Sequence, residues 1–293
     1  MPPPPLTTPL PAQCGSGATT TIQNSGDASE IASCTTYDGS IAIETGTTDD
    51  IDFGSLRSIS GSLIVQEVDR ISSIGGSGLE SIGDSFTLDN VQTLSTLNFP
   101  QLTEVKSIEW IGLPALQGLS FTSGIQSVES LSIQNTNLGS LEGIDLETVD
   151  TFFVANNVYL TEINMQLANV ETSLQIAANG EEVEVEFPNM EWAFNMTFRN
   201  CSRISLPSLA AVNGSLGFYT NYFESLAAPN LTTIGGGLSF VSNEELTNAS
   251  FPELKTVSGG LQLANNTALE EVTGFPSLTR VGGALDINGN FSE

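Results

Sequence analysis

Pairs of apolar residues two positions apart recur along almost the whole chain at a nearly constant interval. Such pairs are typical of β-strands, in which alternate side chains point to the same face of a sheet. Their first members lie 20 to 24 residues apart in the pairs Ile41/Ile43, Leu63/Val65, Phe86/Leu88, Ile108/Trp110, Leu131/Ile133, Phe152/Val154, Leu174/Ile176, Met196/Phe198, Leu216/Phe218, Leu238/Phe240, Leu261/Leu263 and Leu285/Ile287. A repeat of this regularity predicts structural units that stack on one another.

Two further apolar motifs, each with a spacing of three residues, lie between the pairs. Leu254-x-x-Val257 precedes a pair, for example, and Leu269-x-x-Val272 follows one. Gly, Pro and Asn interrupt both motifs, so no unit has room for a helix. We therefore expect an all-β, parallel β-solenoid of about twelve coils of ~22 residues, in which three apolar faces surround the core and each coil buries them against its neighbours. The repeat length and the L-x-L-x-x-N strand are shared with leucine-rich repeats.

The position after each strand pair is predicted to carry an inward-facing asparagine in the second half of the chain. These asparagines are Asn157, Asn179, Asn221, Asn243, Asn266 and Asn290, and Cys201 takes the same position in one coil. Because an amide side chain both donates and accepts hydrogen bonds, stacked copies can form a ladder that satisfies backbone groups at a corner. The first five coils have Gly46, Val68, Val91, Leu113 and Thr136 there, so the ladder is expected only in later coils.

The N-terminal end carries the features of a cap. We expect a disordered Pro-rich tail over residues 1–13, a cap over residues 14–38 and a single solenoid domain over residues 39–293. Cys14 and Cys34 flank a segment in which Asp27-x-x-Glu30 resembles a capping box that opens one helical turn. We expect a Cys14–Cys34 disulfide, with two free thiols as the alternative, whereas Cys201 is expected to be buried and unreactive.

Composition narrows the classes of function. The chain has 34 acidic and 7 basic residues, a formal net charge of −27, which disfavours nucleic acid and anionic membranes as partners. It has no histidine, which removes Ser-His-Asp and Cys-His catalysis and histidine-containing zinc sites. Paired carboxylates, as in glycosidases, stay open as an alternative. We therefore expect no enzyme and predict no catalytic residue, metal site or cofactor. No stretch approaches the length of a transmembrane helix, so no direct membrane insertion is expected.

Sequons for N-glycosylation gather in the last hundred residues. They begin at Asn195, Asn200, Asn213, Asn230, Asn248, Asn265 and Asn290, and the first six are predicted to be modified. Asn290 is excluded from that prediction because it also occupies the inward ladder position. Glycosylation implies secretion, although the first residues lack the basic and apolar regions of a signal peptide, so we expect a mature segment.

Two stretches carry a resemblance to a known family. Residues 14–43 combine a cysteine, a short helix, a second cysteine and a G-S-I-x-I strand, and FPELKTVSGGLQLANN at residues 251–266 is one of several repeated FPxL and GGLxL units. Over about residues 14–290 the chain resembles the fungal GPI-anchored cell-wall-organisation family, which includes the sporulation-specific wall proteins and is similar to receptor L domains. The resemblance implies an extracellular wall glycoprotein with no catalytic residues; the family's secretion signal, C-terminal cap, Ser-rich stalk and GPI signal are not found in this sequence.

Candidate binding residues are few. Phe153 and Ile64 are predicted to stand out as apolar residues on the mostly small and polar outer face of the strands. Tyr219 and Tyr222 lie near a strand end, where aromatic faces could stack on sugars. Core packing is the alternative for the neighbouring Phe223, and a solvated face or a turn is the simpler interpretation of the acidic runs at residues 181–186 and 49–52. The leading hypothesis is a non-enzymatic protein of wall organisation and integrity. The alternative is an adhesive or recognition module that binds polysaccharide or other wall proteins.

Overall fold

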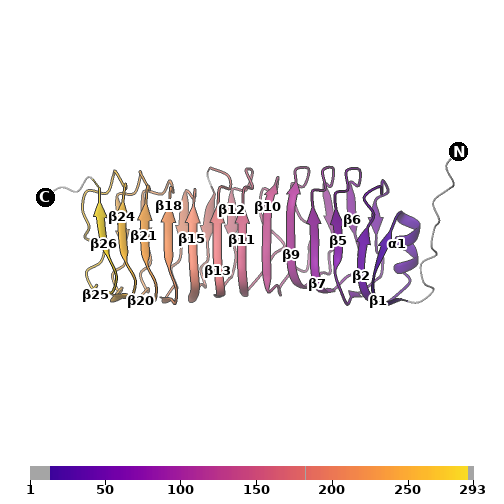
Figure 1. Cartoon of the computed structure of the whole chain (residues 1–293), viewed down its shortest axis with the longest axis horizontal. Helices are drawn as coiled ribbons and strands as arrows, with labels where there is room; N and C mark the ends of the chain where they lie inside the picture. Colours follow the sequence, from indigo (N-terminus) through magenta and orange to yellow (C-terminus); the bar gives the residue numbers. More distant parts are fainter. Residues whose placement is uncertain (1–13, 182, 290–293) are drawn as a thin grey trace.

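The chain forms a straight parallel β-solenoid in a computed structural model that describes residues 14–181 and 183–289. Successive coils stack side by side from the N-terminal helix at one end to the last strand at the other (Figure 1). The predicted Pro-rich tail at residues 1–13 and the predicted ladder residue Asn290 lie outside the described residues. The architecture confirms the predicted all-β solenoid of about twelve coils.

One sheet of 18 parallel strands runs the whole length of the solenoid. Its strands are β1 (Gly15–Ile22), β2 (Thr36–Ile43), β4 (Ser58–Ile59), β5 (Leu63–Gln66), β7 (Ser81–Asp89), β9 (Glu104–Leu113), β10 (Ser130–Thr136), β11 (Thr148–Ala155), β13 (Asn169–Ala177), β15 (Trp192–Arg199), β17 (Ala211–Val212), β18 (Leu216–Tyr219), β20 (Thr233–Ile234), β21 (Leu238–Val241), β23 (Thr256–Val257), β24 (Leu261–Ala264), β25 (Arg280–Val281) and β26 (Leu285–Asn288).

Smaller parallel sheets form another side of the coils. They comprise β3 (Ile51–Asp52), β6 (Ser73–Gly75) and β8 (Thr96–Asn98); β12 (Glu162–Asn164), β14 (Glu184–Glu186) and β16 (Arg203–Ser205); and β19 (Ser225–Ala227) with β22 (Asn248–Ser250). The motif that follows each apolar pair ends in these strands, as where Ile74 lies in β6, Leu97 in β8 and Ile163 in β12.

The register of the main sheet follows the apolar pairs. Ile41 lies beside Leu63, Leu63 beside Phe86, and this pairing continues from strand to strand as far as Leu285. Because the side-chain period of a strand is two, a slip of one residue would expose every apolar pair. The residues between the pair members therefore also stack in a column, with half-buried Phe153 among them.

Two motifs that the sequence predicts as separate faces belong to the same sheet. In β7 the spacing-of-three motif that ends at Ile82 and the pair that begins at Phe86 form one strand, with a shift of register between Ile82 and Ser85. Backbone bonds bridge the corner in other coils, as where Gly61 N–H donates to Gly39 C=O at 3.0 Å. The hydrogen bonding between coils thus continues through the bend that joins these two of the three predicted apolar faces.

The core is apolar along its full length and contains runs of aromatic rings. Phe198, Phe218 and Phe240 occupy equivalent positions in three successive coils, and their ring centroids are 5.5 and 4.9 Å apart. All three side chains are at most 1% exposed. Burial of this kind contributes roughly 25 cal/mol per Å² of apolar surface, and each coil obtains it only from its neighbours.

The N-terminal end is closed by a helix and a disulfide. Helix α1 (Ser25–Ile31) packs Ala28 and Ile31 into the end of the core, and Cys14 and Cys34 are joined by the predicted disulfide. Strand β1, which the sequence did not predict, pairs with β2 and adds one further rung to the main sheet.

The predicted start of this helix is wrong. The N-cap is Asn24, whose Oδ1 accepts from Gly26 N–H at 2.9 Å and from Asp27 N–H at 3.1 Å. Asp27 instead reaches back to accept from Gln23 N–H at 2.8 Å. The N-cap and its acidic partner are therefore Asn24 and Asp27 rather than Asp27 and Glu30, since asparagine is as good an N-cap as aspartate, and the return bond goes to the residue before the N-cap instead of closing a strict capping box.

Candidate functional site

The predicted asparagine ladder is present and fully buried. Asn221 illustrates it: its Oδ1 accepts from Cys201 N–H at 3.0 Å, and its Nδ2 donates to Phe198 C=O at 3.2 Å and to Asn243 Oδ1 at 2.9 Å. The other members repeat the pattern at Asn157, Asn179, Asn243 and Asn266. Each amide side chain thus bonds backbone groups of the preceding coil, and where the next coil also has an asparagine it donates to that side chain, so this position has a structural role.

The ladder starts one coil earlier than predicted and is interrupted once. Thr136, which is 2% exposed, donates through both its backbone N–H and its hydroxyl to Asn157 Oδ1. At Cys201 the side chain is a thiol, so it lacks the amide oxygen that would accept hydrogen bonds from the preceding coil. Burial raises the pKa of Cys201 to about 12, and its Sγ lies 3.6 Å from Arg199 C=O. The thiol is therefore protonated and unreactive at neutral pH.

A left-handed residue precedes the ladder position in most coils. From Glu67 to Asn265, nine non-glycine residues at this corner have φ between 53° and 59°: Glu67, Asn90, Asn135, Asn156, Ala178, Asn200, Thr220, Ser242 and Asn265. In the remaining coil of this series Gly112 takes the position, with φ 69°. This conformation is unfavourable for residues with a Cβ, and asparagine tolerates it better than most, which accounts for five of the nine.

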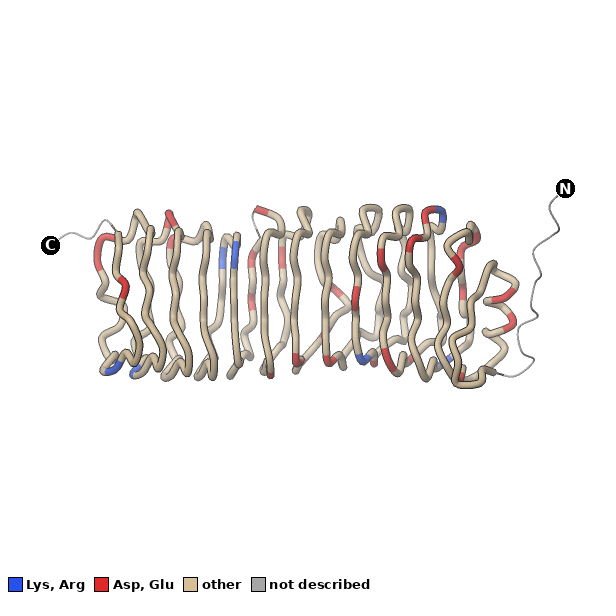
Figure 2. Tube along the Cα trace, viewed as in Figure 1, with Lys and Arg blue, Asp and Glu red and all other residues tan. Residues whose placement is uncertain are grey.

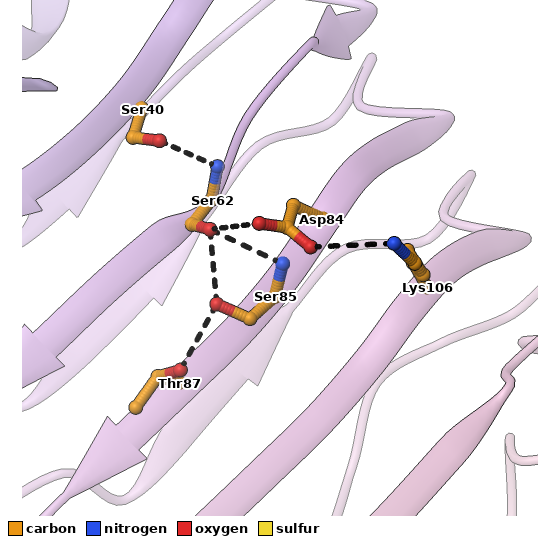
Figure 3. Close-up of polar contacts among 6 residues, drawn as sticks. All are labelled: Ser40, Ser62, Asp84, Ser85, Thr87 and Lys106. Atoms are coloured by element: carbon orange, nitrogen blue, oxygen red, sulfur yellow. Dashed lines mark hydrogen bonds and ion pairs between the residues drawn. The ribbon is translucent and has the colours of Figure 1, made fainter. Parts of the chain in front are cut away.

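Hydroxyl groups form a second polar ladder at the opposite end of the same strands (Figure 3). Thr87 donates to Ser85 Oγ at 3.2 Å, Ser85 donates to Ser62 Oγ at 3.0 Å, and Ser62 lies 3.4 Å from an oxygen of Asp84. Lys106 Nζ lies 4.0 Å from the other carboxylate oxygen. Ser62 is buried and bonded to Ser85 and Asp84 of the next coil, so this chain of hydroxyls joins successive coils.

Acidic residues occur along the whole solenoid, whereas basic residues are few and scattered (Figure 2). Among the described residues, no three acidic, cysteine or histidine side chains form a group that could hold a metal ion. Asp50 instead accepts from Ser72 N–H, Ser72 Oγ and Ser73 N–H at 2.8 to 3.1 Å, and Asp52 accepts from Gly54 N–H at 2.8 Å. The acidic run at residues 49–52 therefore shapes turns between coils.

Three adjoining hollows lie beside the smaller sheets of the middle coils. The upper hollow, of about 660 Å³, is lined by Val158, Tyr159, Thr161, Ala178, Asn179, Gly180, Glu181, Asn200 and Tyr222. A middle hollow of about 500 Å³ shares Thr161 with it and includes Glu162, Glu184 and Ser202. A lower hollow of about 560 Å³ shares Glu184 and Ser202 and continues along Arg203, Phe223 and Glu224. The shared residues make them one groove across four coils.

The upper hollow follows from residue size at one repeated position. The residue directly after the ladder position is Val158, Gly180, Ser202 and Tyr222 in four successive coils. The two small residues in the middle leave space between the larger ones at either end. Gly180 cannot be enlarged, because a Cβ there would lie 2.5 Å from Leu160 C=O. A depression between Val158 and Tyr222 is therefore inherent in the backbone packing.

One arginine pairs with two glutamates in the lower part of the groove. Arg203 lies in register with Glu184 on the neighbouring strand, and its guanidinium is 3.3 Å from Glu184 and 3.3 Å from Glu186. Both glutamates project from β14, while Val183 and Val185 on the opposite face are fully buried. Residues 184–186 thus form a strand with one wet side, as predicted for this acidic run, and the carboxylates of Glu184 and Glu186 are paired with Arg203.

The predicted aromatic residues do not form one cluster. Tyr219 lies on the outer face of the main sheet, and the Cζ atom of Arg199 is 4.2 Å from the centroid of its ring. Tyr222, in contrast, is 40% exposed and lines the upper hollow. Phe223 is buried against Phe218. The sequence reasoning missed Val158 and Tyr159, which are 64% and 62% exposed. Two large apolar residues at a corner that elsewhere carries polar or small ones were the available signal.

The six predicted glycosylation sites are at the surface or partly so. Asn213, Asn230, Asn248 and Asn265 are exposed, and Asn195 and Asn200 are half-buried. Asn200 differs from the others in its surroundings: it lines the upper hollow, and its Nδ2 lies 3.3 Å from Tyr222 Oη and 3.4 Å from Thr220 C=O.

Comparison with known proteins identifies the family. The chain is 46% identical to a cell surface GPI-anchored protein of Arthroderma benhamiae over 92% of its own length and 70% of the relative's. It belongs to this family of fungal cell-surface proteins. It is also 44% identical to the protein ecm33 of Aspergillus fumigatus, over 83% of this chain and 61% of that protein. Sporulation-specific protein 2 of Saccharomyces cerevisiae is 33% identical over 93% of this chain and 55% of that protein.

The family assignment rests on these whole-chain relatives alone. No protein-family model and no solved structure matches the chain. The chain spans little more than half the length of two of the three relatives named above. Within residues 14–181 and 183–289, no helix is long and apolar enough to cross a membrane.

Proposed function

We propose that this chain is a non-enzymatic glycoprotein of the fungal cell surface and wall that contributes to wall organisation and integrity. The observation that carries the proposal is the match to a cell surface GPI-anchored protein over 92% of the chain. Other relatives are named as a cell wall protein of Schizosaccharomyces pombe and a cell wall mannoprotein of Saccharomyces cerevisiae. The disulfide-linked cap supports an oxidising, extracellular location.

The physical character of the solenoid supports an architectural role. Its side chains form continuous ladders along the axis, so a load applied at one coil is passed to the next through buried hydrogen bonds and apolar contacts. Several hydroxyl and carboxylate groups also join the coils: Ser85 donates to Ser62, Ser72 donates to Asp50, and Glu184 pairs with Arg203.

Deletion of the gene in its own fungus tests this role. We expect the deletion strain to grow poorly in the presence of dyes that bind wall polysaccharides, and we expect the wild-type gene to restore growth. In parallel, the secreted, glycosylated protein is incubated with purified wall polysaccharides. Release of oligosaccharides would replace the architectural proposal with an enzymatic one, and normal growth of the deletion strain would remove the support for a role in wall integrity.

A polysaccharide-binding module is the second candidate, and the groove across four coils favours it. The groove combines exposed rings at Tyr159 and Tyr222 with carboxylates at Glu162 and Glu184 that could accept sugar hydroxyl groups. Sedimentation of the protein with insoluble wall polysaccharide measures this activity. Loss of binding in a Glu162→Gln, Glu184→Gln variant, with retention in a variant at the exposed, distant Glu253, is the expected result for a binding groove.

A further inference from the structure

We propose that the sugar chain attached to Asn200 lies in the upper hollow, where it packs on Tyr159 and Tyr222 and covers the apolar surface that they expose. This inference rests on the proposed function, because N-linked sugars are added to proteins that enter the secretory route. It assigns a modification site and an occupant to a hollow that is formed by the solenoid itself.

The attachment atom already points at the hollow. Asn200 Nδ2, the atom to which an N-linked sugar is joined, lies 3.3 Å from Tyr222 Oη. Asn200 is fixed in the left-handed conformation, with φ 58°, and it begins the sequon Asn200-Cys201-Ser202. Cys201 is fully buried and bonded to Asn221, so the backbone that carries Asn200 is held in place. The first sugar is therefore placed beside the Tyr222 ring.

The surface around this atom suits a sugar. Tyr159 and Val158 are more than 60% exposed, and Tyr222 is 40% exposed, in a region whose other corners carry polar or small residues. Large exposed apolar groups of this kind usually mark a contact surface. Aromatic rings present a flat face to the C–H groups of a sugar and a polar edge to its hydroxyls. A hollow of about 660 Å³ falls within the ~300–1,000 Å³ range of small-molecule sites.

Charge favours a neutral occupant. Of the described residues that line this hollow, Glu181 alone carries a charge, and it is negative. The chain as a whole carries −27, which disfavours an anionic ligand. A neutral N-linked glycan meets both conditions and needs no diffusional encounter, because it is tethered at the edge of the hollow.

Asn265 supplies a matched control. It has the same corner position as Asn200, with φ 56°, it begins a sequon with Asn266 and Thr267, and it lies outside the three hollows. The hydroxyls that complete the two sequons also match, since Ser202 donates to Val183 C=O at 3.1 Å and Thr267 donates to Glu244 C=O at 3.2 Å. Ser202→Ala and Thr267→Ala thus each remove one sequon and one similar hydrogen bond, and leave the asparagine unchanged.

The experiment compares these two variants in protein secreted by the native fungus and in protein made without N-glycans. Site occupancy is measured by mass spectrometry of glycopeptides, and stability by thermal unfolding. We expect Asn200 to be occupied and Ser202→Ala to lower Tm by about 2–5 °C more than Thr267→Ala in the glycosylated protein. The difference should vanish without glycans, and also in a Tyr159→Ser, Tyr222→Ser background.

Other outcomes would overturn the proposal in distinguishable ways. Occupancy of other sequons with an unmodified Asn200, or equal Tm losses in the two variants, would overturn this inference and leave the surface-glycoprotein proposal standing. An unmodified Asn200 combined with binding of soluble polysaccharide that depends on Tyr159 and Tyr222 would assign the hollow to an external ligand. If no sequon is occupied, both the inference and the proposed glycoprotein character fail.

Discussion

Truncation of one ladder amide should destabilise the protein far more than truncation of an exposed one. In Asn221→Ala, the N–H of Cys201 loses its acceptor and the C=O of Phe198 loses its donor, while Asn243 Oδ1 keeps the backbone N–H of residue 221. Asn221 is 2% exposed, so water does not replace the lost partners without rearrangement.

The magnitude follows from these two orphaned groups. A buried backbone donor or acceptor that loses its partner costs about 1–3 kcal/mol. Two such groups give an expected loss of about 3–5 kcal/mol in the free energy of unfolding, since alanine also leaves a small void. The control is Asn189→Ala, because Asn189 is exposed and donates only to the Gln166 side chain. Its cost should stay within about 0.5 kcal/mol.

Urea unfolding followed by circular dichroism provides the assay. We expect the midpoint of Asn221→Ala to fall with little change in the slope of free energy against urea, because the surface exposed on unfolding is nearly the same. A loss below about 1 kcal/mol, or one equal to that of Asn189→Ala, would refute the reasoning. It would mean that the corner backbone relaxes to find other partners and that the ladder does not hold the coils together.

Three further predictions concern other features of the solenoid. Gly236→Ala should strongly destabilise the protein, because a Cβ there would lie 2.8 Å from backbone atoms of the previous coil. Gly118→Ala should be neutral or stabilising, because a Cβ there would have nothing within 4 Å. Thermal unfolding measures both variants, and equal effects would contradict the packing argument. The pKa of Asp50 is lowered, chiefly because the Ser72 hydroxyl donates to its carboxylate. Burial acts in the opposite direction, and the backbone N–H groups of Ser72 and Ser73 lower the pKa further. This carboxylate therefore stabilises the fold above its unfolded pKa of ~3.9, and the stabilisation is lost as the pH falls below that value. Between pH 5 and 2.5 the Asp50→Asn variant should lose less free energy of unfolding than the wild type. Parallel profiles of stability against pH in the two proteins would contradict this prediction. Replacement of both Cys14 and Cys34 by serine should lower the free energy of unfolding by about 3 kcal/mol, because the disulfide closes a loop of 20 residues. Urea unfolding of the variant and of the wild type under non-reducing conditions measures this loss. An unchanged midpoint would show that the disulfide does not stabilise the protein.

The fold could be predicted from the sequence because every coil repeats the same pattern of inward-facing residues. The pair Ile41/Ile43 and its eleven counterparts fix the register of the main sheet, and the asparagines after the later pairs fix a corner. The start of α1 could not be fixed in the same way, since Asn24 and Asp27 are both suitable caps and no repeat distinguishes them. Strand β1 was missed because it lies before the first apolar pair, in a segment rich in Gly and Thr.

The groove was less accessible to prediction because it depends on differences between coils rather than on what they share. Tyr222 could be singled out as an aromatic residue near a strand end, but its neighbour across the hollow is Tyr159, which lies three coils away. The space exists because small residues, Gly180 and Ser202, take in the two intervening coils the position that Val158 and Tyr222 have in the outer coils. Alignment of the coils by their ladder residues would have brought these four positions together.

The ladder position holds the solenoid together, whereas the position directly after it is free to vary and to acquire a function. A ladder residue such as Asn221 is bonded to the coils on both sides, so its replacement affects the stacking of three coils at once. The next residue, Tyr222, is held by a backbone bond to Cys201 C=O, while its side chain faces solvent. Side chains at this position can therefore change size and chemistry from coil to coil without loss of the register. A repeat protein can build a local hollow, and place a sugar attachment site at its edge, only at positions of this second kind.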